Sequence, residues 1–371
     1  MVNKDNHIEI VYVQIGTAKA PHLIANIKLV RSMFPNILIN CVVTKNSISH
    51  NSLPEYVNAI IYKPNNLIDS MLNKKSIDIN FRDGFWRFTF ERLLALHEAH
   101  ICRPKSSLIH IESDIFIFPN FPFNRFKEIN SICWLPFNEF RDAASLMYFP
   151  TLSKSLDFHA DLKNLLVGSK QINDMEALRT LRAQFPQKYR LLPSSDVKFR
   201  KLTNLSNNED LRLRKVFDGI FDSAPIGMWL TGIDPRNNFG ITHFFATNTI
   251  KKLKTMTNPS AYPLYLLNEG NLVFKNGSKL LNVYNLHVHS KSKKIFSNTW
   301  RREITRLTKL SNKNRHVYKF SFTVLIELLT SNFRKGTLLA YLYNSPLIVG
   351  IRKNSLSLFV LKKLNYKSKK L

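Results

Sequence analysis

The chain has 371 residues, of which 44% are hydrophobic and 12% aromatic, and it carries a formal net charge of +28. This composition excludes an intrinsically disordered protein and leaves room for one large α/β domain with an appendage, or for two smaller domains. The positive charge is concentrated late, because residues 291–371 hold 19 Lys and Arg residues against Glu303 and Glu327. Such a segment suits an anionic partner, although a Lys-rich composition with a solvated surface gives the same pattern.

The first 65 residues alternate between strand and helix patterns. Apolar, β-branched runs predict three strands, at residues 8–15, 37–44 and 59–62. Periodic apolar residues from Pro21 to Met33 predict a helix between the first two strands. Strand–helix–strand units with short connections indicate a parallel sheet. Ligands bind beyond the carboxyl ends of such strands, so Gln14, Gly16 and Thr17 lie where a nucleotide is expected.

The middle of the chain continues in the same manner. A helix is predicted at residues 85–100, and a mainly helical region from Arg141 to about Gln184. Further strands are predicted at residues 108–111, 115–118, 131–136, 189–192 and 281–289. The sequence therefore predicts a mostly parallel α/β sheet flanked by helices in residues 1–291, followed by a basic, largely helical extension at residues 292–371.

The cysteines and the apolar segments bear on location. Cys41, Cys102 and Cys133 have no CxxC spacing, so we expect buried free thiols in a reducing compartment, without a disulfide framework or a zinc site. The first six residues contain no apolar segment, and the apolar stretch from Thr337 to Ile351 is interrupted by polar residues. We therefore expect neither a signal peptide nor a membrane-spanning helix, and a cytoplasmic location.

Glu112 and Asp114 directly follow the apolar strand at residues 108–111. Each unpaired charge in a low-dielectric site costs several kcal/mol, and a hard divalent cation such as Mn²⁺ or Mg²⁺ relieves that cost. A metal held there can clamp a diphosphate and stabilise charge on a leaving group. The alternative is an ordinary strand-to-turn boundary with exposed acids.

The segment at residues 110–117, His-Ile-Glu-Ser-Asp-Ile-Phe-Ile, resembles the apolar strand, DxD motif and second apolar strand of GT-A glycosyltransferases, with Glu in place of the first Asp. This resemblance implies a metal held by Asp114, with Glu112 as a further ligand, and the substitution leaves open which carboxylate coordinates directly. The preceding helix also resembles its counterpart in that class, which implies that Arg92 faces the donor and pairs with phosphate. A salt bridge or a solvated helix face is the alternative for Arg92.

Three later segments extend the resemblance. His287 and His289 alternate in a strand and so share one face, and with Lys291 they resemble the late histidine ligand and diphosphate-binding residue of GT-A enzymes. Both histidines are candidate ligands, with His289 favoured because it lies nearer the strand end, and two hydrogen-bonded strand histidines are the alternative. The start of the helix at Asp174 resembles an acidic segment beneath the sugar, where Asp174 would orient sugar hydroxyls or act as a base, although helix capping is an alternative.

Residues 217–237 resemble a segment of bacterial surface-glycan transferases, and this implies Asp222 as a base or a sugar contact. The glycines of this segment permit close backbone approach. Trp229 either forms a stacking floor for a sugar or is buried in the fold.

Together the resemblance spans about residues 8–291. It implies a metal-dependent glycosyltransferase, of hexosyltransferase type, that moves a sugar from a nucleotide-sugar donor to a hydroxyl of a glycan or lipid-linked acceptor in polysaccharide biosynthesis. The basic extension would hold such an enzyme peripherally at the inner face of a membrane. Two alternatives stay open. One is a nucleic-acid-binding protein that uses the basic tail, against which stands the lack of a nucleic-acid-binding motif. The other is an inactive scaffold of the same fold.

Overall fold

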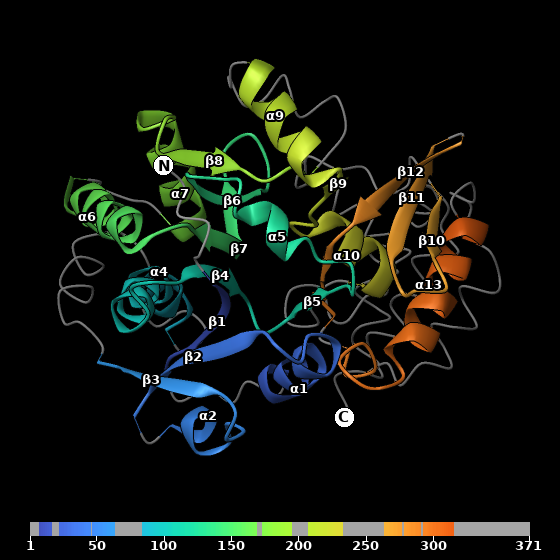
Figure 1. Ribbon diagram of the computed structural model, residues 1–371, viewed down its shortest axis with the longest axis horizontal. Coiled ribbons are helices and arrows are strands. Elements are labelled where there is room, and N and C mark those ends of the chain that lie inside the picture. The colour runs from blue at the N-terminus through green and yellow to red at the C-terminus, as the bar shows by residue number, and fades with distance from the viewer. Residues whose placement is uncertain are drawn as a thin grey trace, which may run out of the picture.

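The computed structural model describes residues 7–16, 22–45, 47–63, 84–168, 173–194, 207–232, 263–276, 278–290 and 292–314. Its centre is a seven-stranded sheet with the order β3-β2-β1-β4-β7-β6-β8 (Figure 1). These strands are β1 (Ile8–Gln14), β2 (Leu38–Thr44), β3 (Asn58–Tyr62), β4 (Ser107–Ile111), β6 (Ile132–Pro136), β7 (Asp142–Phe149) and β8 (Tyr189–Leu191). The first four run parallel, and β7 runs antiparallel to both its neighbours. The predicted mostly parallel α/β sheet is therefore confirmed.

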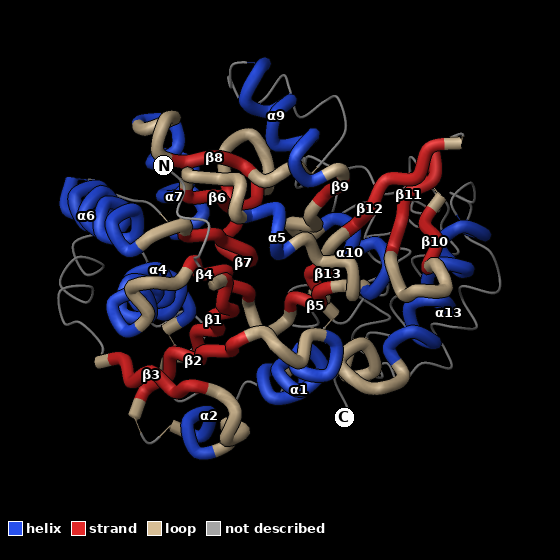
Figure 2. The backbone as a smooth tube through the Cα atoms, viewed as in Figure 1, coloured by secondary structure: helices blue, strands red, loops and turns tan. Residues whose placement is uncertain are grey.

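Helices cover both faces of this sheet (Figure 2). The helices of the described residues are α1 (Leu23–Met33), α2 (Ile48–Asn51), α4 (Phe85–Cys102), α5 (Phe123–Phe126), α6 (Leu152–Gly168), α7 (Asp174–Gln184), α9 (Asn207–Phe217), α10 (Pro225–Thr231) and α13 (Trp300–Asn314), of which α9, α10 and α13 pack on the smaller sheets or on one another. Successive strand residues point to opposite faces, so Ile10 and Ile109 join the core beside α1, whereas Val11 and Leu108 join the core beside α4, α6 and α7. The thiols of Cys41 and Cys133 are buried, as predicted, whereas Cys102 is exposed because it ends α4.

One prediction for the middle of the chain is wrong. The helical region predicted from Arg141 to about Gln184 begins instead with the strand β7, and its helices are α6 and α7. Alanine, leucine and methionine in residues 142–149 favour a helix by propensity, but all eight residues of the strand are buried between β4 and β6. Pairing with both neighbouring strands satisfies the backbone and outweighs that propensity.

Two smaller sheets accompany the large one, with the orders β10-β11-β12-β9 and β13-β5. Their strands are β5 (Ile115–Ile117), β9 (Gly219–Ile220), β10 (Leu264–Leu266), β11 (Leu272–Asn276), β12 (Lys279–Val283) and β13 (Asn285–His287). The single strand predicted at residues 281–289 is divided at Tyr284. The N–H of Tyr284 donates to the carbonyl of Ile220 (2.9 Å), and its carbonyl accepts from the N–H of Phe118 (3.0 Å). This change of partner carries the chain from β12 to the side of β5.

The basic segment that follows residue 291 is described as far as residue 314, where α13 packs against α10 and β10. Ile304 and Leu307 of α13 are buried in the core, and the side chain of Asn312 hydrogen-bonds both backbone groups of Leu264. The exposed residues of α13 include four basic ones: Arg301, Arg302, Arg306 and Lys309. Within the part of the chain that the structure describes, no helix combines the length and apolarity needed to cross a bilayer. Residues 315–371 lie outside that part.

Candidate metal centre

The turn at residues 112–114 stands at the carboxyl end of β4, where the chain leaves the large sheet for β5. The N–H of Glu112 donates to the carbonyl of Ser145 in β7 (3.0 Å), which continues the β4–β7 pairing by one residue. From the other side, the amide of Asn26 in α1 donates to the carbonyls of Ser113 (3.1 Å) and Ile115 (2.7 Å). The turn is therefore held by a strand on one side and a helix on the other, and this fixes the backbone that carries the two carboxylates.

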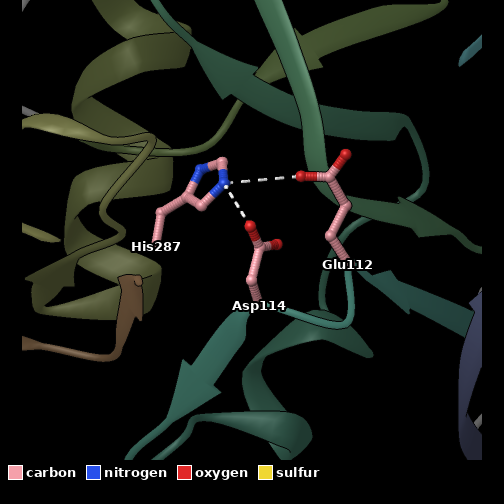
Figure 3. Close-up of side chains that lie close together, drawn as sticks. All are labelled: Glu112, Asp114 and His287. Carbon is pink, nitrogen blue, oxygen red and sulfur yellow. Dashed lines mark ion pairs between the residues drawn. The ribbon is translucent and has the colours of Figure 1, made fainter. Parts of the chain in front are cut away.

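His287 reaches this turn because β13 pairs with β5, with His287 opposite Ile115. The N–H of Val288 extends the pairing by donating to the carbonyl of Asp114 (2.8 Å). Nε2 of His287 lies 3.4 Å from Oδ2 of Asp114 and 3.6 Å from Oε2 of Glu112 (Figure 3). In Figure 3 the two carboxylates of this turn and the imidazole of His287 point toward one another.

The other ring nitrogen of His287 fixes its tautomer. Nδ1 lies 2.9 Å from the carbonyl oxygen of Ser223, and because a carbonyl only accepts, Nδ1 carries the proton. Nε2, which faces the two carboxylates, is therefore the ring nitrogen placed to bind a metal ion. This is the arrangement that metal-bound histidines adopt when a backbone carbonyl orients them.

The sequence favoured His289 as ligand, but the structure brings His287 to the carboxylates. The strand ends at His287, and His289 belongs to the turn that follows, where its N–H donates to the carbonyl of His287 (2.9 Å). The two rings stack, with centroids 4.0 Å apart and planes inclined by 29°. The histidines therefore share one side of the chain, as alternation predicted, and His289 supports the ring of His287.

The donor set fits a divalent cation. One ligand atom each from Glu112, Asp114 and His287 can be chosen so that all three lie within 4.8 Å of one another. Oxygen and nitrogen ligands bind Mn²⁺ or Mg²⁺ at roughly 2.0–2.2 Å, so two ligands of one ion are separated by up to about 4.4 Å. A small adjustment of side chains would bring the three atoms into one coordination shell. Two carboxylates and an imidazole are a suitable set for Mn²⁺, and carboxylates for Mg²⁺.

Arg92 and Asp174 lie beside this centre. One terminal nitrogen of Arg92 in α4 contacts Glu112, and the other lies 3.3 Å from Oδ2 of Asp174, the first residue of α7. Burial raises the pKa of the Asp174 carboxyl, and the nearby charge of Arg92 opposes that rise. Asn173 caps α7 in a capping box with Glu176, so Asp174 itself is not the cap. The structure therefore unites two residues that the sequence singled out separately.

Asp222 hydrogen-bonds the backbone of His287 through its carboxylate. Its carboxylate is 1% exposed and accepts four backbone N–H groups, from Ala224 (3.0 Å), Ile226 (2.9 Å), Gly227 (2.7 Å) and His287 (3.0 Å). Burial raises the pKa of Asp222, and these donors oppose the rise. The carboxylate therefore hydrogen-bonds the start of α10 and the backbone of β13.

Gln14 and Gly16 stand at the carboxyl end of β1, next to β4 and therefore on the same edge of the sheet as Glu112. Gly16 has φ 85°, a left-handed conformation, and its N–H donates to Oγ1 of Thr44 (3.0 Å). A Cβ at Gly16 would come within 2.7 Å of the ring of Phe88 in α4. The chain at this edge is therefore closely packed against α4.

Three remaining residues from the sequence analysis have different outcomes. Thr17 and Lys291 lie outside the described residues. Trp229 is buried, and its indole N–H contacts Oγ of Ser311, so it is a core residue of α10.

Sequence reasoning missed the residues that hold the centre in place. Asn26 carried a usable signal, since it is a polar residue on the buried face of a predicted helix, beside Leu23, Ile27 and Val30. Ser223 carried none, because it acts through its backbone carbonyl.

No protein-family model matches this chain, and no curated protein matches it. Among solved structures, an active-site mutant of LgtC matches with a TM-score of 0.36 at 13% identity, over 58% of this chain and 85% of that one. The apo form of mouse xyloside xylosyltransferase 1 matches with a TM-score of 0.32 at 11% identity, over 57% of this chain and 93% of that one. At TM-scores of this size the two matches carry no conclusion about chemistry, which is therefore argued from the side chains of the site.

Proposed function

We propose that this protein is a metal-dependent glycosyltransferase that moves a sugar from a nucleotide-sugar donor to a hydroxyl of a glycan or lipid-linked acceptor. The observation that carries the proposal is the convergence of Glu112, Asp114 and His287 at the carboxyl edge of a mostly parallel sheet. In open α/β sheets that edge is where nucleotides and phosphates bind.

The charges of the cluster support a divalent ion. Glu112, Asp114 and Asp174 contribute three negative charges when ionised, and Arg92 contributes one positive charge. The cluster thus has an excess of two negative charges in a partly buried site. Such an excess is costly without a cation, and Mn²⁺ or Mg²⁺ carries the charge that balances it.

Each residue then has a distinct task. Glu112, Asp114 and His287 would hold the ion, which when bound supplies positive charge to a nucleoside diphosphate leaving group. Arg92 offers a planar guanidinium for phosphate oxygens, in addition to its contact with Glu112. Asp174, at the start of α7, would orient sugar hydroxyls or accept the proton of the acceptor hydroxyl.

The remaining sequence candidates complete this hypothesis. Gln14, Gly16 and Thr17 would contact the nucleotide at the end of β1, and Lys291 would meet the diphosphate. The division into a catalytic domain at residues 1–291 and a basic extension at residues 292–371 stays part of the proposal. The exposed arginines of α13 are consistent with attachment to an anionic membrane surface on its cytoplasmic side.

The first test is a panel of UDP-, GDP-, CMP- and dTDP-sugars, measured by thermal shift and calorimetry with and without Mn²⁺. We expect one donor to bind only with metal, and this binding to be lost in Asp114→Asn. Asp157→Asn, on the exposed face of α6, is the matched control and should bind as the wild type does. A folded protein that binds no donor would contradict the proposal and favour the scaffold or nucleic-acid alternatives.

A further inference from the structure

We infer that Asp222 is a positioning residue for His287. Its carboxylate hydrogen-bonds the backbone of both α10 and β13, and it thereby fixes the tautomer and the direction of the imidazole of His287. This inference rests on the proposed metal-dependent function, because it concerns a ligand of the same centre. It gives Asp222 a different task from the base or sugar contact that the sequence suggested.

The carboxylate of Asp222 ties two elements together. Oδ1 accepts from the N–H groups of Ala224 and Ile226, which begin α10 (3.0 and 2.9 Å). Oδ2 accepts from Gly227 of the same helix (2.7 Å) and from His287 of β13 (3.0 Å). A single oxygen thus joins the first turn of α10 to the backbone of the candidate ligand, and a buried carboxylate with this many donors is rigidly held.

A second set of bonds aligns the backbone of Asp222 with β13. The N–H of Asp222 donates to Oδ1 of Asn285 (3.0 Å), and the amide of Asn285 donates to the carbonyl of Asp222 (2.8 Å). Asn285 is fully buried. This reciprocal pair places Ser223 beside His287, so that its carbonyl oxygen accepts from Nδ1 at 2.9 Å. The tautomer of His287 therefore depends on where Asp222 holds the chain.

The fit between α10 and β13 leaves little room for an alternative position. A Cβ on Gly227 would lie 1.9 Å from the carbonyl oxygen of His287, so the helix and the strand meet backbone to backbone. Only glycine allows that approach. Because the contact is this close, a change in the hydrogen bonds at Asp222 would move the backbone of His287 and not merely its side chain.

Charge, and not only size, is needed at Asp222. Asparagine has the same shape, but one of its two terminal atoms is an amide nitrogen that donates. In Asp222→Asn, that nitrogen would take the place of either Oδ1 or Oδ2. In each position it would face two N–H donors. The substitution therefore removes two acceptors while preserving volume, and it isolates the positioning role from packing.

The test reads the tautomer and the metal affinity separately from turnover. The full chain, labelled with ¹⁵N at histidine and free of metal, should show His287 protonated at Nδ1. In Asp222→Asn we expect a mixture of tautomers, and an affinity for Mn²⁺ in calorimetry that is about 10- to 100-fold weaker. Asn285→Ala, which removes only the second set of bonds, should shift both readouts in the same direction and serves if Asp222→Asn does not fold. Ser47→Ala removes a helix cap on α2, far from this centre in the fold, and should change neither.

The outcomes separate this inference from the proposed function. If the wild type binds Mn²⁺ and Asp222→Asn keeps both the wild-type affinity and a single tautomer, Asp222 is not a positioning residue. If the wild type binds no Mn²⁺, the proposed function fails. In that case the tautomer of the metal-free chain still decides the role of Asp222, with an unchanged tautomer in both variants overturning it.

Discussion

Nε2 of His287 lies 3.4 Å from Oδ2 of Asp114, although Asp114 belongs to the turn between β4 and β5 and His287 ends β13, far along the chain. An ion bound between them would connect the early α/β region to β13 and, through Asp222, to α10. Metal binding is therefore expected to stabilise the fold as well as to prepare the site, since a ligand that binds only the folded state raises the free energy of unfolding.

The two histidines should respond differently to substitution. At a Mn²⁺ concentration of 100 times its Kd, the wild type should gain about 2.7 kcal/mol of unfolding free energy. His287→Gln should lose most of this gain, because Nε2 of His287 faces the carboxylates, whereas His289→Gln should keep most of it. Chemical denaturation with and without Mn²⁺ measures both. A larger loss in His289→Gln than in His287→Gln would show that the wrong histidine has been assigned to the metal.

Arg92→Met should destabilise the metal-free protein by about 3 kcal/mol, because it leaves the partly buried carboxylates of Glu112 and Asp174 without the cation that they contact. Added Mn²⁺ should then raise the melting temperature more in this variant than in the wild type, since the centre has become more negative. Arg306→Met breaks an exposed pair with Glu303 on α13 and should cost less than about 1 kcal/mol. Equal losses in the two variants would argue against a special role for Arg92.

A stacked pair of histidines between α4 and α6 predicts loss of stability in mild acid. The rings of His97 and His159 lie 4.4 Å apart. Burial lowers the pKa of His159 to about 4 and also lowers the pKa of His97, and the charge of Lys163 acts in the same direction on both, while Glu98 opposes the shift of His97. The folded pair is thus neutral at pH values where the unfolded chain takes up protons. The contribution of this pair to the free energy of unfolding is complete above about pH 6.5 and declines as the pH falls toward 4.

Because His159 is only partly buried, the decline due to His159 should be on the order of 1 kcal/mol. His159→Gln should flatten the dependence of unfolding free energy on pH between 6.5 and 4, as measured by urea denaturation at several pH values. The same slope in the variant and the wild type would rule out His159 as its source.

The sequence was sufficient to predict the parts of the fold whose signals are local. The strands β1 and β2 and the helix α1 between them follow from periodicity, and Glu112 and Asp114 were found because two acids follow a buried strand. β7 was missed because several of its residues, among them two alanines, Leu146 and Met147, favour a helix, and pairing with β4 and β6 makes it a strand.

The assembled site depends on contacts that leave no local pattern. His287, and not His289, lies against the carboxylates because the chain changes its pairing partner at Tyr284 and the strand ends at His287. The sequence around Asp222 resembles that of a catalytic acid. In the structure its carboxylate accepts hydrogen bonds from the backbone at the start of α10, and no sequence pattern marks those contacts. Pairing between distant strands decides both points.

Gly16→Ala should destabilise the protein and weaken donor binding. Its left-handed φ of 85° costs an L-residue about 1–2 kcal/mol, and the added Cβ would press on Phe88 at 2.7 Å, so we expect a loss of about 2 kcal/mol or more. Displacing Phe88 would disturb the edge of the sheet where the nucleotide is proposed to bind, so the Kd of the donor should rise as well. Gly168→Ala at the end of α6 is the matched control, because nothing lies within 4 Å of its new Cβ, and it should change stability by less than about 0.5 kcal/mol. Chemical denaturation and donor calorimetry on the two variants measure both effects. If Gly16→Ala were as stable as Gly168→Ala, the chain after β1 would accommodate the added Cβ without strain. The proposed nucleotide site would then not depend on a fixed backbone at Gly16.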